Sequence, residues 1–176
     1  MLLISPTHFK DYELIDCGNF EKLERFGTYV TIRPEPQAVW DRRLSKREWE
    51  QRANVRFEPR SSSSGTWRKL REMPDRWQMG YQVGKSDVHP GTRINFRLAL
   101  TSFKHVGIFP EQAVNWDYIH SCIRSMKTEQ PKVLNLFAYT GGASLAARSA
   151  GADTTHLDSV KQVVTWAREN MEHSSL

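Results

Sequence analysis

The sequence predicts an α+β, strand-rich amino-terminal module followed by the start of an α/β domain. Three observations lead to this fold class. Apolar residues alternate with a period of two before about residue 104, they recur at helical spacing after Pro110, and an apolar run near residue 135 leads directly into paired glycines. We therefore expect a β-rich module over 1–103, a linker helix within 104–130, and the first strands and helices of an α/β domain over 131–176.

The composition is that of a globular chain. With 176 residues, 39% of them hydrophobic and 26% charged, the chain is long enough to bury a sizeable core. No apolar run approaches the roughly 18 residues of a membrane span, and the first ten residues lack the basic and apolar regions of a signal peptide, so we expect a cytoplasmic location. Cys17 and Cys122 lie far apart and outside any Cys-x-x-Cys pattern, so neither a disulfide framework nor a metal site is expected.

Four runs in the first hundred residues are typical of strands. Two are "YELID" (12–16) and "TYVTIRP" (28–34). The other two, "WQMGYQV" (77–83) and "RINFRLAL" (93–100), flank a loop with Gly, Asp and Pro, so they predict a β-hairpin. In this pair, one face of each strand is apolar, formed by Trp77, Met79, Tyr81 and Val83 in the first and by Ile94, Phe96, Leu98 and Leu100 in the second.

Two helices are expected before residue 130. Ser45 and Glu48 have the spacing of a capping box, which predicts a short helix in "LSKREWEQRA" (44–53). The segment "SSSSG" (61–65) is typical of a flexible loop. Pro110 suits a first helical turn, and the helix that follows should end before "TEQPK" (128–132). Its apolar face is expected to consist of Trp116, Ile119, Ile123 and Met126.

The last 45 residues contain the most informative pattern. "KVLNLF" (132–137) is apolar enough to predict a strand buried on both faces, and "AYTGG" follows it without a linker. Paired glycines permit a tight turn, and the first amides of the next helix can donate to an electronegative group. A small-residue helix, a second strand "TTHLD" (154–158) and an amphipathic helix "SVKQVVTWAREN" (159–170) complete the pattern.

Asp158 ends the second predicted strand, 17 positions after Gly141. A carboxylate at about this separation accepts hydrogen bonds from ribose hydroxyls in nucleotide-binding α/β folds. Two simpler interpretations are that Asp158 caps a helix beginning at Ser159, and that the glycines form a tight turn with no ligand. A dinucleotide is disfavoured because Gly141 and Gly142 are adjacent and the next glycine is Gly151, whereas S-adenosylmethionine has no phosphate and needs only one or two glycines.

These segments resemble those of a known family. "VLNLFAYTGGASLAA", followed by "AGADTTHLDSVKQVVTWARENMEHSSL", is similar to the cofactor-binding start of class I S-adenosylmethionine-dependent methyltransferases, in the group of the large-subunit ribosomal RNA cytosine methyltransferases. "SFKHVGIFPEQAVNWDYI" and the strand-rich region before it resemble the upstream segments of that group.

The resemblance implies a Rossmann-like methyltransferase domain that is incomplete in this chain. The family's Asp-Pro-Pro type motif follows the second strand, and the sequence contains no Pro-Pro pair. We therefore assign no catalytic residue, and we expect this chain alone to transfer no methyl group. Cys122 lacks an activating neighbour in the predicted helix, so it is not expected to act as a nucleophile.

The resemblance also implies which residues contact the cofactor. Phe109 and Gln112 would close the site from the linker helix, although Gln112 could equally be a solvated first-turn residue and Phe137 a core aromatic. Asp158, followed by Ser159, would hold the ribose. The methionine part would be surrounded by Asn135, Phe137, Ala138, Tyr139, Thr140, Gly141 and Gly142.

A net charge of +5 and a pI near 9.4 agree with a polyanionic partner, and equally with an ordinary solvated basic surface. If the chain acts on RNA, the β-rich module could be its substrate-binding arm. Stacking and phosphate contacts would then come from Trp40, Trp49 and Trp67 with Arg42, Arg43, Lys46, Arg47, Arg68, Lys69 and Arg71. The alternative is a nucleic-acid-binding module without catalysis, in which the α/β segment is only a scaffold.

Overall fold

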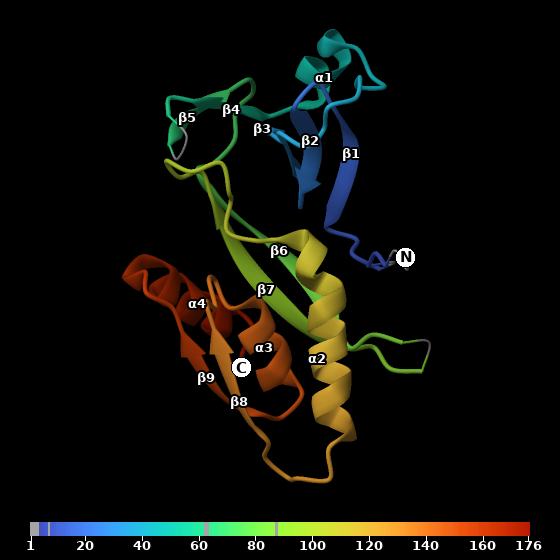
Figure 1. Cartoon of the computed structure of the whole chain (residues 1–176), viewed down its shortest axis with the longest axis vertical. Coiled ribbons are helices and arrows are strands. Elements are labelled where there is room, and N and C mark those ends of the chain that lie inside the picture. The colour runs from blue at the N-terminus through green and yellow to red at the C-terminus, as the bar shows by residue number, and fades with distance from the viewer. Residues whose placement is uncertain (1–3, 7, 62–63, 87) are drawn as a thin grey trace. The chain divides into compact units, whose positions relative to one another are not determined.

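The computed structural model describes residues 4–6, 8–61, 64–86 and 88–176 (Figure 1). The chain forms two compact units. The β-rich unit consists of Lys10–Met79 and Leu98–Val106, and the strand-helix unit consists of Gly80–Arg97 and Gly107–Leu176 with the described residues before Lys10.

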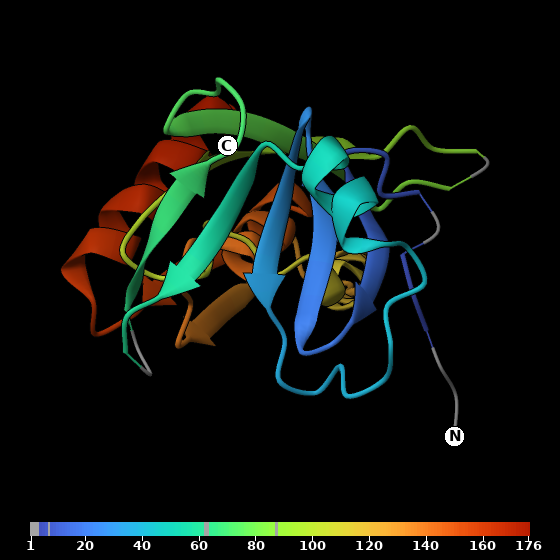
Figure 2. The ribbon, with the colours of Figure 1, turned by 90° about the horizontal axis from the view of Figure 1, so that it is seen from above.

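A five-stranded sheet forms most of the β-rich unit. Its order is β1 (Tyr12–Gly18), β2 (Glu21–Phe26), β3 (Tyr29–Pro34), β4 (Val55–Pro59) and β5 (Gly65–Lys69), with neighbours antiparallel except for the parallel pair β3 and β4 (Figure 2). Helix α1 (Lys46–Arg52) lies in the crossover between the parallel strands. The strands expected at 12–16 and 28–34 are confirmed, and so is the capping box of Ser45 and Glu48.

Strands β2, β4 and β5 were not predicted. Their sequences "EKLERF", "VRFEP" and "GTWRK" are short and rich in charged residues, and even the alternation of Val55 and Phe57 in β4 is too brief to predict a strand. The charged residues pair across the sheet instead, as Arg56 does with Glu21 and Arg68 with Glu58. Ser61 and Ser64 of the expected flexible loop are described, while residues 62–63 lie outside the described part of the chain.

Trp49 belongs to the core of the β-rich unit. It is fully buried and packs with Leu23, Ile32 and Ala53. The hypothesis that Trp49 stacks on RNA is therefore wrong, because the capped helix α1 directs this residue toward the sheet. The guanidinium of Arg42 lies over its ring, 4.5 Å from the centroid.

Strands β6 (Arg76–Val83) and β7 (Thr92–Ala99) form the expected hairpin. The predicted apolar residues of both strands are buried, and Leu100, which follows the end of β7, is partly buried. Residue 87 of the connecting loop lies outside the described residues. The hairpin contributes residues to both compact units. The expected linker helix belongs to the same unit as the last 45 residues. The division into two compact units therefore differs from the division into modules expected at residue 103.

The strand-helix unit also contains the 3₁₀ turn Pro110–Gln112, α2 (Ala113–Ser125), β8 (Lys132–Leu136), α3 (Gly142–Ser149), β9 (Asp153–Leu157) and α4 (Lys161–His173). Pro110 lies in the 3₁₀ turn that precedes the linker helix, and α2 ends before residue 128 as the sequence predicts. Trp116 and Ile123 are buried and Ile119 packs on the cluster around Ile123, but Met126 is exposed because it lies at the C-cap, past the helix. Among the described residues, no helix has the length and apolarity to cross a membrane.

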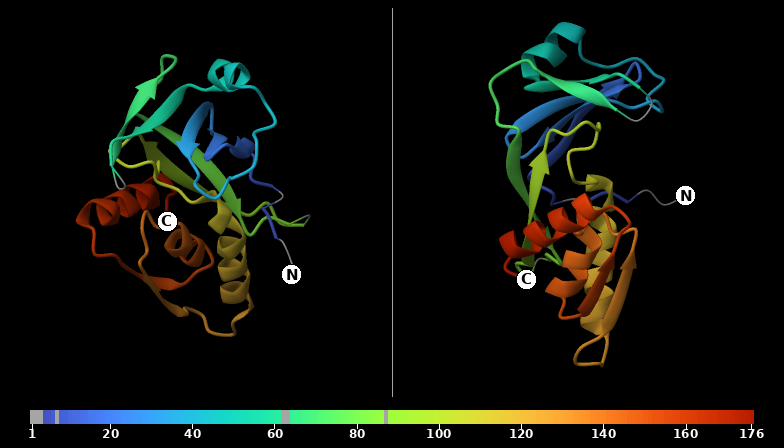
Figure 3. Two further views of the ribbon diagram at one scale, coloured as in Figure 1. Left: turned by 45° about the horizontal axis from the view of Figure 1, so that its top comes forward. Right: turned by 90° about the vertical axis from the view of Figure 1, so that its left-hand side faces the viewer.

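Strands β8 and β9 are parallel and pair from Lys132 with Asp153 to Leu136 with Leu157 (Figure 3, right). The expectation that residues 132–137 are buried on both faces is wrong. Val133 packs against α2 and α3, whereas Leu134 is 61% exposed. In the described structure the sheet has two strands and helices pack on the Val133 face, so the opposite face is left in solvent.

Candidate functional site

The corner between β8 and α3 has an unusual backbone. Phe137 and Tyr139 have φ of 54° and 51°, and Gly141 has φ of 96° as the N-cap of α3. Positive φ is rare for bulky residues and clusters at functional sites, where surrounding contacts hold it in place. The amide of Gly141 donates to the Ala138 carbonyl at 3.1 Å, which closes the turn.

Three other segments fix this corner. The Ala138 amide donates to the Leu157 carbonyl at the end of β9 at 3.1 Å. The Thr140 hydroxyl donates to the Gly107 carbonyl at 2.7 Å, and the Asn170 side-chain amide of α4 donates to the Thr140 carbonyl at 2.9 Å. The strained corner is therefore held by β9, by α4 and by the segment that leads into α2.

Asp158 connects the ends of the two parallel strands. Its Oδ1 accepts from the Val160 amide and its Oδ2 from the Tyr139 amide, both at 2.9 Å. These hydrogen bonds, of which the one from Val160 has the larger effect, hold the pKa of Asp158 below its usual value. The carboxylate is therefore ionised at neutral pH. Each carboxylate oxygen can accept a further hydrogen bond. The interpretation that Asp158 caps a helix at Ser159 is wrong, because α4 begins at Lys161 with Val160 as its N-cap and Ser159 is exposed before it.

A cavity of about 430 Å³ lies at the carboxyl end of β8. It brings together eight of the predicted cofactor residues: Phe109, Gln112, Asn135, Phe137, Ala138, Tyr139, Thr140 and Gly142. The rings of Phe109 and Tyr139 are 5.0 Å apart between centroids. Phe137 is 92% exposed, so the interpretation as a core aromatic is wrong.

The other predicted residues lie elsewhere. Gly141, Asp158 and Ser159 do not line this cavity, although Asp158 binds the amide of Tyr139, which does. Gln112 is both solvated and part of the cavity wall, and its Oε1 accepts from the Asn115 side chain at 2.9 Å.

Sequence reasoning missed five lining residues. For three of them the only available signal was a position beside a predicted residue: Ile108 precedes Phe109, Glu111 precedes Gln112 and Ala143 follows Gly142. The other two come from the hairpin and from the interior of α2. The five residues are Phe96, Ile108, Glu111, Trp116 and Ala143.

A hydrogen-bonded chain supports one wall of the cavity. The Asn135 side-chain amide donates to the Ser144 hydroxyl at 2.9 Å, which in turn bonds to His156 Nδ1 at 2.9 Å. Burial lowers the pKa of His156, so its imidazole is neutral at physiological pH. These hydrogen bonds fix the direction of the Asn135 amide and connect β8, α3 and β9.

A second cavity of about 540 Å³ involves α3, β9 and α4. Arg148, Asp153 and Arg168 line it, and Gly141 is the predicted site residue that it contains. Ligands of parallel α/β sheets bind beyond the carboxyl ends of the strands, which favours the cavity beside Tyr139 and Asp158 over this one.

Comparison with known proteins shows which proteins this chain resembles. No family model matches the chain. The crystal structure of an S-adenosylmethionine-dependent methyltransferase from Agrobacterium tumefaciens matches 100% of this chain and 52% of that one, with 37% identity and a TM-score of 0.86. This chain is similar to S-adenosylmethionine-dependent methyltransferases. A putative methyltransferase of this type from Streptococcus mutans, at 18% identity and a TM-score of 0.65 over 97% of this chain, shows the same fold.

Similarity to curated proteins is more local. Ribosomal RNA large subunit methyltransferase K/L of Shewanella frigidimarina is 35% identical over 82 residues, 46% of this chain and 11% of that protein. The protein of the same name from Magnetococcus marinus is 35% identical over 80 residues. This chain thus spans about half of the solved methyltransferase and about a tenth of these curated ones. The predicted resemblance and the Rossmann-like fold class are confirmed.

Proposed function

We propose that this chain is part of an S-adenosylmethionine-dependent methyltransferase that acts on RNA, and that the cavity at the carboxyl end of β8 binds the cofactor. One observation carries the proposal. Eight residues predicted from the sequence line a single cavity, and the ionised Asp158 directly follows the neighbouring strand β9 and accepts from the amide of Tyr139 in the cavity wall. The proposal includes the cofactor contacts that the sequence predicts for these residues.

The side chains around the cavity fit the cofactor's chemistry. S-adenosylmethionine supplies an electrophilic methyl group, and it presents an ammonium, a carboxylate and a ribose diol. Glu111 can attract the ammonium, the first amides of α3 at Gly142 and Ala143 can donate to the carboxylate, and Asp158 can accept from the diol. In this proposal the chain's residues bind and orient the cofactor.

The RNA substrate is supported by the names of the curated relatives and by the positive net charge. In the β-rich unit, Trp40, Arg43, Lys46 and Arg47 are exposed and available for such contacts. Several other residues of the predicted set form ion pairs within the fold: Arg42 with Glu21, Arg68 with Glu58, and Lys69 with Asp75.

Filter binding across a salt series tests the RNA contacts. If phosphate contacts dominate, the amount of RNA retained on the filter should fall steeply as the salt concentration is raised. A flat response would show that the basic residues of the β-rich unit are an ordinary solvated surface.

Calorimetry with S-adenosylmethionine tests the cofactor site. We expect binding, and we expect Asp158→Ala to weaken it by about 1–3 kcal/mol because ribose hydroxyls lose their acceptor. Asp153→Ala, at the opposite end of β9, is the matched control and should bind like the unaltered chain. Absence of both heat and thermal stabilisation at millimolar cofactor would contradict the proposal and favour a module without catalysis.

A further inference from the structure

The β-rich unit contains its own pocket, of about 370 Å³, away from the residues assigned to the cofactor. Phe57, Ser61, Ser64, Phe103, Lys104 and His105 are among the residues that line it. We propose that this pocket binds one unstacked nucleobase of single-stranded RNA. The inference rests on the proposed RNA substrate and extends it by naming where a base is held.

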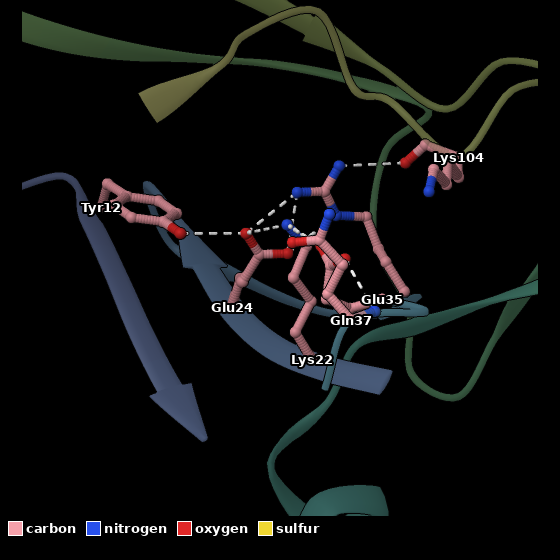
Figure 4. A network of polar contacts seen from close by, with 7 residues as sticks. Tyr12, Lys22, Glu24, Glu35, Gln37 and Lys104 are labelled. Atoms are coloured by element: carbon pink, nitrogen blue, oxygen red, sulfur yellow. Dashed lines mark hydrogen bonds and ion pairs between the residues drawn. The ribbon is translucent and has the colours of Figure 1, made fainter. Parts of the chain in front are cut away.

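A buried ion pair holds one wall of the pocket in place. Glu24 is fully buried and accepts from Arg33 at 2.8 and 2.9 Å, while Tyr12 and Lys22 also bond to its carboxylate (Figure 4). Arg33 donates in turn to the Lys104 carbonyl at 3.1 Å. A buried ion pair contributes little net stability compared with apolar packing, but it fixes the orientation of the guanidinium. Here that guanidinium fixes the backbone of the pocket wall.

Two more bonds hold the same segment. The Trp67 indole donates to the Phe103 carbonyl at 3.2 Å, and the Gly65 amide donates to the Ser102 carbonyl at 2.9 Å. Three consecutive carbonyls are thus engaged, yet the Phe103 side chain is 54% exposed. An aromatic ring held on a fixed backbone loses little entropy when a base stacks on it, which is the property of a stacking platform.

The polar groups of the pocket suit a nucleotide. Burial first, and then the charges of Arg33 and Lys104, lower the pKa of His105 to about 4, so this imidazole is uncharged at physiological pH and can contact the polar edge of a base. The hydroxyls of Ser61 and Ser64, which also line the pocket, lie 2.8 Å apart. The ammonium of Lys104 can meet a phosphate, and most of the chain's excess positive charge falls within this unit, which favours a polyanion over a peptide.

The test uses the full chain and a fluorescein-labelled single-stranded RNA of about ten nucleotides, read by anisotropy. Phe103→Leu should weaken binding by roughly 5- to 100-fold, the loss expected for one stacked base. Phe20→Leu is the matched control, because Phe20 is a phenylalanine of the same unit with a similar exposure of 58%. It should leave affinity unchanged, and photo-cross-linking with 5-iodouridine RNA should label residues 103–105.

Equal effects of Phe103→Leu and Phe20→Leu, with labels outside residues 103–105, would overturn the pocket and leave the methyltransferase proposal intact. Binding of unstructured peptides in place of RNA would also overturn it. Failure of the cofactor proposal is read separately, by calorimetry with S-adenosylmethionine.

Discussion

At the scale of single residues, Asp16 shows how one buried carboxylate organises a loop. It accepts from the Leu44 amide at 2.9 Å and from the Trp49 indole at 2.8 Å, and the amides of Arg43 and Cys17 also donate to it. Burial alone would raise the pKa of Asp16, but these four hydrogen bonds outweigh it and lower the pKa below the usual value. Asp16 thus joins β1 to the start of α1.

This arrangement predicts a specific pH dependence. A carboxylate with a lowered folded-state pKa adds stability that is present above its unfolded pKa of about 4 and is lost as pH falls through the folded pKa. We expect Asp16→Asn to cost about 1.5–3 kcal/mol at pH 7 and to flatten the loss of stability below pH 4, measured by urea unfolding. Glu72→Gln, at an exposed carboxylate, is the control. An unchanged acid limb in Asp16→Asn would contradict this role.

At the scale of elements, the close approach of α2 and α3 shapes the cavity that we propose for the cofactor. A Cβ added at Gly142 would lie 2.6 Å from the ring of Trp116, which is too close for any real contact. Both residues line the cavity, so the glycine sets the distance between the two helices at the site.

We therefore expect Gly142→Ala to destabilise the strand-helix unit by about 1–3 kcal/mol and to weaken S-adenosylmethionine binding. Gly151→Ala is the control, because a Cβ there meets no atom within 4 Å and the cost comes only from its φ of 100°. It should lower the melting temperature without changing cofactor affinity. Equal affinities for the two variants would show that the helix contact does not shape the site.

The elements also show what sequence patterns can predict. The hairpin, the capped helix and the β8-α3-β9-α4 order depend on local periodicity and were predicted. The burial of β8 was not, because the exposure of Leu134 depends on what packs against the sheet rather than on its own apolarity. Trp49 was likewise misplaced, since a tryptophan among basic residues is compatible with either a surface or a core position.

At the scale of the whole molecule, the candidate site draws on distant segments of the strand-helix unit. Phe96 comes from the hairpin and Trp116 from α2, and the corner at Thr140 is bonded to Gly107. The contiguous motif at residues 135–142 could be recognised from the sequence, whereas these partners are brought to it only by folding. The pocket lined by Phe103, Lys104 and His105 could not be predicted from the sequence for the same reason, because its walls come from separate strands and loops.

The central claim is that S-adenosylmethionine binds at the carboxyl ends of β8 and β9, and amide NMR tests it most directly. Titrating the ¹⁵N-labelled chain with S-adenosylhomocysteine should shift the amides of Phe109, Tyr139, Gly142 and Ser159. Shifts confined to the second cavity, around Arg148 and Arg168, or no shifts at millimolar ligand, would contradict the account.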